Sequence, residues 1–151
     1  MQHANPVADA VATLDHLLVV CSDGAEGYRR AARAVEDARV HAALARAAAD
    51  REAMGAVLTN ALVSLGHKPA HHGSVRGALH QRWIDAIGAL PRHATSRILE
   101  ECARGERETV AAFVEAAGRP LPAAAHDVTE TLLRRALEAA ARLAELTANV
   151  A

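Results

Sequence analysis

Apolar and polar residues follow one another along most of the chain with the spacing of an α-helix. Apolar residues recur every three or four positions from Val7 to Leu65 and again over about residues 94–148, which is the period of one helix face. A single straight helix from Val7 to Leu65 would be on the order of 90 Å long, too long for a compact domain of this size. We therefore expect a corner around Asp37, whose side chain can cap the second helix.

Prolines and glycines mark the other expected boundaries. The five prolines stand at positions 6, 69, 91, 120 and 122, and proline is poorly tolerated inside a helix. Gly66 follows the second apolar stretch in the position of a C-cap glycine, and Gly118 lies just beyond another helical stretch. The sequence therefore predicts helices over about residues 8–35, 38–65, 74–89, 94–117 and 122–148.

The lengths of the connections predict the topology. The first two long helices and the last two are joined by short connections, so we expect each pair to be antiparallel, whereas the connection between the pairs is long enough to carry the chain along the whole bundle. This predicts an all-α, ferritin-like four-helix bundle that forms a single domain over residues 1–151. Its one long crossover would contain the short extra helix 74–89.

Two segments share the local motif Cys-x-x-Gly, and each of the two cysteines of the chain is the first residue of one copy. Cys21 and Cys102 are 81 residues apart, and Gly24 and Gly105 follow them. This suggests two equivalent helix hairpins whose cysteines approach one another at the bundle centre. Packing as small apolar residues is the favoured role of the cysteines, and a redox pair is the alternative. Each mid-helix glycine costs about 1 kcal/mol of helix stability relative to alanine. We explain the presence of these glycines by close approach of helices 8–35 and 94–117 or by a local bulge.

Composition and charge support the helical assignment and exclude several function classes. Alanine is abundant, aromatic residues make up 2%, and the net charge is −1 with acidic and basic residues interspersed. Strand formers are therefore scarce, and no basic patch suits nucleic acid or an anionic membrane. No lysine or arginine precedes Arg29, so the basic segment that a secretory signal needs is missing, and the apolar run from Leu14 to Cys21 is too short to cross a bilayer. We expect a cytoplasmic protein with reduced cysteines.

Candidate chemistry is sparse. Nucleophile-elbow, phosphate-loop and dinucleotide signatures are absent from the sequence. A di-metal carboxylate bundle uses Glu-x-x-His pairs, and no glutamate here has histidine three residues later. The remaining metal candidates are Glu26 and Glu106, with iron, manganese or zinc as the ions to consider. Glu106 lies on an apolar stripe, where a carboxylate needs a partner. We favour pairing with an arginine or a neighbouring backbone, or an oligomer contact, over metal ligation.

The histidine-rich segment GHKPAHHG and the predicted helix after it hold further polar candidates. We interpret His67, His71 and His72 as parts of an exposed loop, with adventitious nickel or zinc binding as the alternative. Trp83 is expected to anchor the short helix to the bundle, with His80 hydrogen-bonded beside it. The same pair is also compatible with a binding groove.

Four stretches occur in the order CSDGAEGYRRAA, AAADREAMGAVLTNALVSLGHKP, GSVRGALHQRWIDAI and ILEECARGERETVAAF. Together they resemble a bacterial ferritin-like family of four-helix-bundle proteins called domain of unknown function 2383, and the similarity extends to about Pro122. The resemblance implies a ferritin-like fold and no established activity. The chain has Val57 and Ala61 where the family usually has glutamates, Arg107 where it has an acid, and no His-Asp pair in the last helix. Each departure removes a potential metal ligand.

These observations lead to two principal hypotheses for the function. The first is a non-enzymatic binding or self-association module that forms a homo-oligomer (dimer) or binds a protein partner, in a stress setting suggested by analogy with the superfamily. It requires no cofactor. The second is a metal-dependent oxidoreductase or metal-storage protein with a reduced ligand set around Glu26 and Glu106. A small-ligand pocket between the helices, near Gly24 and Gly105, is a third hypothesis.

Overall fold

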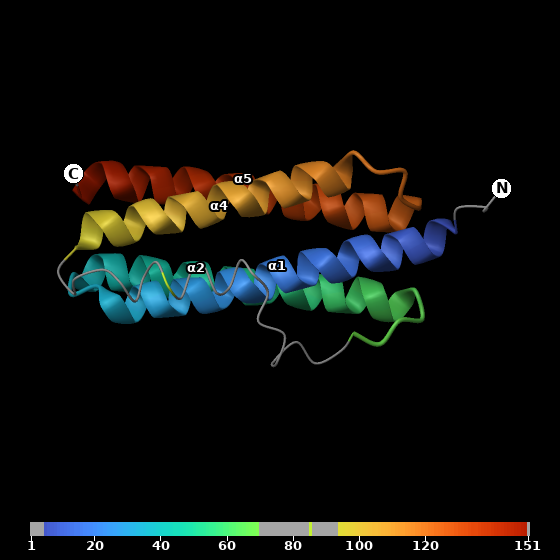
Figure 1. Cartoon of the computed structure of the whole chain (residues 1–151), viewed down its shortest axis with the longest axis horizontal. Coiled ribbons are helices and arrows are strands. Elements are labelled where there is room, and N and C mark those ends of the chain that lie inside the picture. The colour runs from blue at the N-terminus through green and yellow to red at the C-terminus, as the bar shows by residue number, and fades with distance from the viewer. Residues whose placement is uncertain (1–4, 70–84, 86–93, 151) are drawn as a thin grey trace.

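The part of the chain that the structure describes is a bundle of four long helices. A computed structural model describes residues 5–69, 85 and 94–150. The four helices of these segments lie side by side along one long axis (Figure 1), which confirms the predicted all-α class. The predicted helix 74–89 falls, apart from residue 85, outside the described residues, and so do His71, His72, His80 and Trp83. The helices are α1 (Pro6–Ala34), α2 (Ala38–Ser64), α4 (Thr95–Ala117) and α5 (Ala123–Val150).

Capping groups fix where the helices begin and end. The Asn5 side chain accepts a hydrogen bond from the backbone amide of Val7 at 3.1 Å, which starts α1 two residues earlier than predicted. Asp37 accepts from the first backbone amides of α2 at 2.8 and 2.9 Å, so the predicted corner and N-cap are confirmed. Gly66 has φ +77°, the left-handed conformation that suits a glycine after a helix. All four helices begin and end within two residues of the predicted positions.

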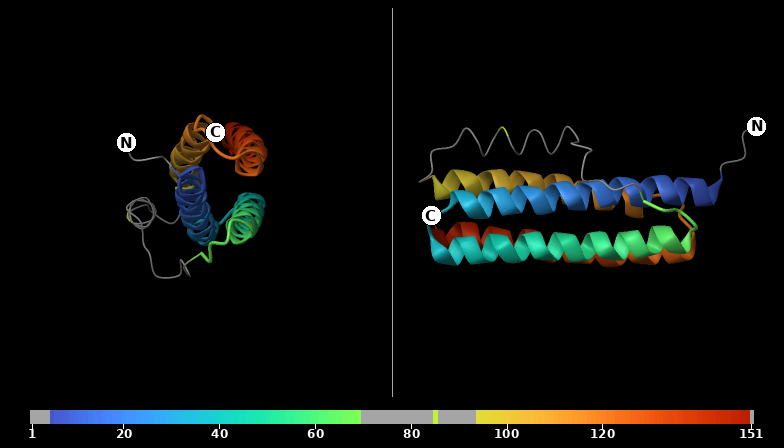
Figure 2. Two further views of the ribbon diagram at one scale, coloured as in Figure 1. Left: turned by 90° about the vertical axis from the view of Figure 1, so that its right-hand side faces the viewer. Right: turned by 90° about the horizontal axis from the view of Figure 1, so that it is seen from below.

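Each helix packs against two principal neighbours. α1 packs on α2 and α4, and α5 packs on α4 and, less closely, on α2. The end-on view in Figure 2 shows the two hairpins, α1–α2 and α4–α5, packed on one another. Consecutive helices within each hairpin are antiparallel, and α1 is also antiparallel to α4 (Figure 1). α2 ends and α4 begins at opposite ends of the bundle. This is the geometry that a long connection between the hairpins requires. None of the described helices is apolar enough over sufficient length to cross a membrane.

The interior consists of two hydrophobic clusters placed one after the other along the bundle. Burial of such side chains is the dominant favourable contribution to folding. Between the clusters, the buried positions of α1, α2 and α4 change from apolar to polar, and this interruption locates the candidate site. One cluster includes Leu14, Leu17, Cys21, Met54, Leu58, Phe113 and Leu132; the other includes Tyr28, Leu44, Ile98, Leu99, Cys102 and Leu143.

Candidate functional site

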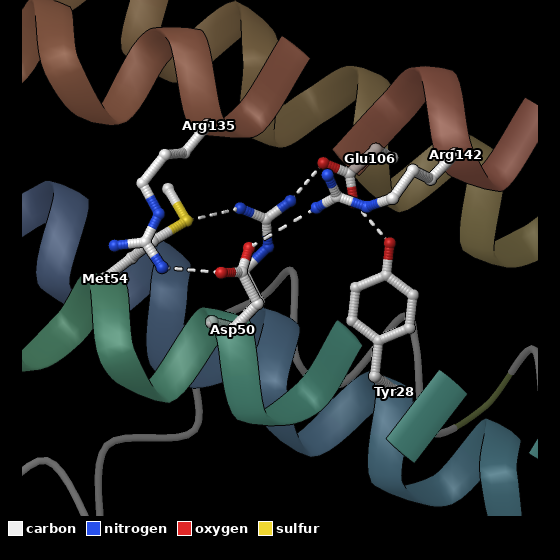
Figure 3. Close-up of polar contacts among 7 residues, drawn as sticks. Tyr28, Asp50, Met54, Glu106, Arg135 and Arg142 are labelled. Carbon is white, nitrogen blue, oxygen red and sulfur yellow. Dashed lines mark hydrogen bonds and ion pairs between the residues drawn. The ribbon is translucent and has the colours of Figure 1, made fainter. Parts of the chain in front are cut away.

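A buried polar cluster lies between the two hydrophobic clusters. It consists of Tyr28 from α1, Arg51 from α2 and Glu106 from α4, and is called the central polar cluster below. Their exposed fractions are 2%, 1% and 2%. The Tyr28 hydroxyl donates a hydrogen bond to Oε2 of Glu106, and Nη2 of Arg51 donates to Oε1 of the same carboxylate. Figure 3 shows the Tyr28 hydroxyl and the Glu106 carboxylate pointing toward one another. One carboxylate thus joins three helices.

Two further contacts hold the Arg51 side chain in place. Its Nη1 lies 3.0 Å from the Sδ of Met54. A Cβ built at position 24 would lie 3.4 Å from the Cδ of Arg51, and the three nearest atoms all belong to this arginine. The space beside Gly24 is therefore filled by the arginine from α2. The sequence had led us to attribute this glycine to close approach of α4, and the structure gives a different neighbour.

Burial and charge act together on the ionisable groups of the cluster. Burial, and then the adjacent Glu106 carboxylate, raise the pKa of Tyr28 well above its ordinary value. Burial by itself lowers the pKa of Arg51, but the charge and hydrogen bond of Glu106 more than compensate, and the pKa is raised. At neutral pH the cluster therefore contains a neutral phenol and a permanent cation beside the carboxylate.

A second set of ion pairs links α2 to α5 beside the cluster. Asp50 lies between two arginines of α5 (Figure 3). Its Oδ1 is 2.5 Å from Nη2 of Arg135, and its Oδ2 is 3.9 Å from Nη2 of Arg142. Asp50 precedes Arg51 in sequence, so consecutive residues of α2 bind charged side chains of α5 and α4, respectively. These contacts fix the spacing of α2 and α5 near the middle of the bundle.

A groove of about 600 Å³ lies beyond Asp50, between the first half of α2 and the second half of α5. We call it the α2–α5 groove. Tyr28 contributes to its lining together with leucines and alanines, and charged side chains also border it. The volume lies within the range of small-molecule pockets, which are concave and mainly apolar with a few polar groups. The lining residues are Tyr28, Arg39, Ala43, Leu44, Arg46, Ala47, Asp50, Ala139, Arg142, Leu143, Glu145, Leu146 and Asn149.

The two predicted metal candidates occupy different environments. Glu26 is on α1 and accepts hydrogen bonds from Arg29 at 3.0 Å and Arg30 at 3.1 Å. Glu106 is in the central polar cluster, where its partner is Arg51, so it pairs with an arginine as one of the sequence interpretations expected. Among the residues that the structure describes, no three histidine, cysteine or acidic side chains gather as a metal site would require. A guanidinium beside Glu106 also disfavours a second cation there.

The two cysteines lie in different hydrophobic clusters, and both are free and buried. Burial raises the pKa of Cys21 to about 12 and raises that of Cys102 as well. Cys21 is seven residues before Tyr28, and Cys102 is four residues before its partner Glu106. Because α1 and α4 are antiparallel, these offsets add, and the cysteines are about 16 Å apart along the axis. The arrangement agrees with the packing role rather than with a redox pair.

The sequence interpretation missed Arg51 and the α2–α5 groove. Arg51 had a detectable signal, because it lies in the apolar stripe of α2 between Ala48 and Met54, as Glu106 does in α4. Two opposite charges on two apolar stripes are expected to meet, since an unpaired buried charge is costly. The groove had no comparable signal. Neither Gly24 nor Gly105 lines it, so the pocket expected near these glycines is not the one described here.

Comparison with known proteins places the chain in a family context. A family model described as "Domain of unknown function (DUF2383)" matches residues 9–118, which include α2, α4 and all of α1 except its first three residues, but not α5. Both predicted metal candidates and all three residues of the central polar cluster fall within the matched range. Half of the α2–α5 groove, the half formed by α5, lies beyond it. No curated protein matches the chain.

Proposed function

The chain belongs to the DUF2383 family, and from this premise we propose that it is a non-enzymatic, ferritin-like binding module that holds a small ligand in the α2–α5 groove. The observation that carries the proposal is the groove itself, a concave surface of about 600 Å³ with leucines, alanines and the Tyr28 ring in its lining. Such a surface removes apolar ligand area from water, which is the main source of small-molecule affinity. The helix directions and the separation of the hairpin ends support the ferritin-like assignment.

The central polar cluster favours binding over chemistry. Each of its three side chains is at most 2% exposed, so a substrate has no direct access to the carboxylate. The Glu106 oxygens already accept hydrogen bonds from Tyr28 and Arg51, one at each oxygen. The cluster holds Tyr28 in one orientation, with its hydroxyl turned toward α4 and its ring contributing to the groove. In this proposal the central polar cluster keeps the Tyr28 ring in position as part of the binding surface.

The groove can be tested with a neutral apolar dye. We expect Nile red to bind the purified protein at one equivalent with enhanced fluorescence. The substitution Ala139→Trp places a bulky ring in the groove, because Ala139 is part of its lining, and should abolish the enhancement. Ala141 is an exposed alanine of the same helix that does not line the groove, so Ala141→Trp is the matched control and should bind as the wild type does.

The two tryptophan variants must first show wild-type helicity by circular dichroism. If the wild-type protein shows no saturable binding of the dye, the proposed function is wrong. Equal loss in both variants, or equal retention in both, would also contradict it, because the site would then not be the α2–α5 groove.

A further inference from the structure

We propose that the ligand of the α2–α5 groove is an amphiphile with an anionic head group, of the type of a medium-chain carboxylate, whose apolar tail lies on the groove floor. This inference rests on the proposed function and specifies its ligand class. Three features of the groove carry it: the balance of charge in its lining, two arginines that have no ion-pair partner among the described residues, and the separation of its apolar and charged parts.

The lining carries more positive than negative charge. Arg39, Arg46 and Arg142 face two acids, Asp50 and Glu145. The negative charge of Asp50 does not fully neutralise the groove arginines. Of its two arginine contacts, the shorter one, at 2.5 Å, is with Arg135, which is not part of the lining. With the Asp50–Arg135 pair counted as neutral, three guanidinium groups stand against one carboxylate. An anion is therefore the complementary ligand.

Two of these arginines have no partner among the residues that the structure describes. Within the described residues, the side chains of Arg39 and Arg46 make no ion pair and no hydrogen bond, and Arg142 reaches Asp50 only at 3.9 Å. Because α2 and α5 are antiparallel and Asp50 faces the Arg135–Arg142 stretch, Arg46 lies one turn from Asp50 and close to the level of Arg142. Guanidinium groups on opposite sides of a groove suit a carboxylate, which each can bind through two N–H groups.

The apolar part of the lining lies deeper than the charged part. Leu44 and Leu143 are buried and Tyr28 is 2% exposed, whereas Arg39, Arg46 and Arg142 are exposed. The hydroxyl of Tyr28 is engaged with Glu106, so the phenol presents mainly its ring to the groove. A ligand that is complementary to both parts of the lining has an apolar tail, which contacts the buried floor, and a charged head group, which contacts the exposed arginines at the rim.

The test compares three ligands that share a ten-carbon chain and differ in head group: decanoate, decanol and decyltrimethylammonium. Binding to the full-length protein is measured by isothermal titration calorimetry at low ionic strength. We expect decanoate to bind more tightly than decanol and decyltrimethylammonium to bind most weakly. Added salt should weaken decanoate binding, because the rim charges are exposed and therefore screened.

The rim arginines are tested by charge reversal with a matched control. Arg46→Glu should weaken decanoate binding by about fivefold or more and strengthen binding of the cationic probe. Arg134→Glu changes an exposed arginine of α5 that does not line the groove, and should leave the order of the three probes unchanged. Both sites are exposed, so both variants are expected to fold, which circular dichroism verifies.

The outcomes distinguish this inference from the proposed function. If Nile red binds the groove but the cationic probe equals or exceeds decanoate, the ligand class is wrong and the binding function stands. The ligand class is also wrong if Arg46→Glu and Arg134→Glu affect decanoate equally. If Nile red does not bind the groove at all, both proposals fail together.

Discussion

Arg51 carries a permanent positive charge where the helix pattern expects an apolar side chain. It is 1% exposed, and its charge is balanced by Glu106, which is 2% exposed. Removing water from both ions costs several kcal/mol each, and the pair compensates only while both members are present. The partner helices α2 and α4 are thereby held at one register. A buried pair of this kind is weak evidence for added stability but makes each member indispensable to the other.

Loss of Arg51 alone should therefore lower the free energy of unfolding far more than neutralising both members of the pair. We expect Arg51→Met to lower the free energy of unfolding by about 3–5 kcal/mol, because Glu106 is left buried and unpaired. The double variant Arg51→Met/Glu106→Gln removes both charges and keeps an acceptor for Tyr28, so it should recover most of the loss. Urea denaturation followed by circular dichroism measures both.

An exposed arginine provides the comparison for this prediction. Arg104 on α4 pairs with Glu101 and Glu108, each at 2.8 Å, with about a third of each side chain exposed. Arg104→Met should cost no more than about 1 kcal/mol, as solvent-exposed pairs do. If the double variant were as unstable as Arg51→Met, the cost would come from lost packing and not from the unpaired carboxylate.

Tyr28 should make stability depend on alkaline pH. Its pKa is raised well above the ordinary value by burial and by Glu106, whereas in the unfolded chain the phenol ionises near pH 10. Above that pH the unfolded state binds fewer protons than the folded state, so the free energy of unfolding must fall as pH rises. We expect Tyr28→Phe to remove this component of the pH dependence.

The measurement is simplified because Tyr28 is the only tyrosine of the chain. Tyrosinate absorbance should remain absent from the folded protein above pH 10 and appear when the protein unfolds. Cys21 and Cys102, whose pKa values are also raised, contribute equally to both proteins and cancel in the comparison. Tyrosinate formation near pH 10 without unfolding would show that the phenol is not held in the central polar cluster.

At the scale of the elements, the antiparallel packing of α1 and α4 determines what the repeated Cys-x-x-Gly motif can do. The hydrogen bond between Tyr28 and Glu106 fixes the register of α1 and α4 at the bundle centre. The hydrogen bond that Arg119, just after α4, donates to Thr13 of α1 at 3.3 Å is consistent with the same register near the C-terminal end of α4. In this register the two cysteines lie on opposite sides of the Tyr28–Glu106 hydrogen bond along the bundle axis, in separate hydrophobic clusters.

The cysteines should therefore not form an intramolecular disulfide. A disulfide requires Cα atoms within about 7 Å, and the axial offset alone is about 16 Å. After treatment of the folded protein with an oxidant such as diamide, we expect two free thiols by mass spectrometry with alkylation under denaturing conditions. In the folded state both thiols should react slowly with a disulfide reagent, because burial raises their pKa values. An intramolecular Cys21–Cys102 bond in the native protein would contradict the register.

At the scale of the whole molecule, we propose the outer face of α2 as the contact surface of the homodimer that the sequence led us to expect. Exposed alanines recur on it every three or four residues, and their small side chains permit close contact with another helix. The exposed larger apolar side chains are scattered over all four described helices, with Val57 and Val63 on α2, and are ordinary surface features. The exposed alanines of α2 include Ala42, Ala45, Ala49, Ala53 and Ala56.

Self-association can be measured by sedimentation velocity. We expect the wild-type protein to sediment as a dimer and Ala49→Glu to sediment as a monomer, because burying a carboxylate in the centre of the contact removes it from water at a high cost. Ala144→Glu, at an exposed alanine of α5, should remain dimeric. A wild-type protein that is monomeric at all accessible concentrations would rule out self-association as part of its function.

The amino-acid sequence by itself determined the helices and the class of fold. Period, caps and proline positions are local properties, and they predicted all four described helices to within two residues, including the N-cap at Asp37 and the C-cap glycine at position 66. The sequence also placed Glu106 on an apolar stripe, where a carboxylate needs a partner. It left an arginine, a neighbouring backbone, an oligomer contact and a metal ion open as that partner, because a helical stripe does not show which helix or molecule covers it.

Only the tertiary structure decided which residues meet. The partner of Glu106 is 55 positions away in sequence, and the neighbour of Gly24 is that same Arg51. The α2–α5 groove depends on how far two helices from different hairpins separate, which follows from the packing of all the helices together. Contacts between distant segments reflect global packing and charge pairing, whereas helix boundaries reflect the chemistry of a few adjacent residues.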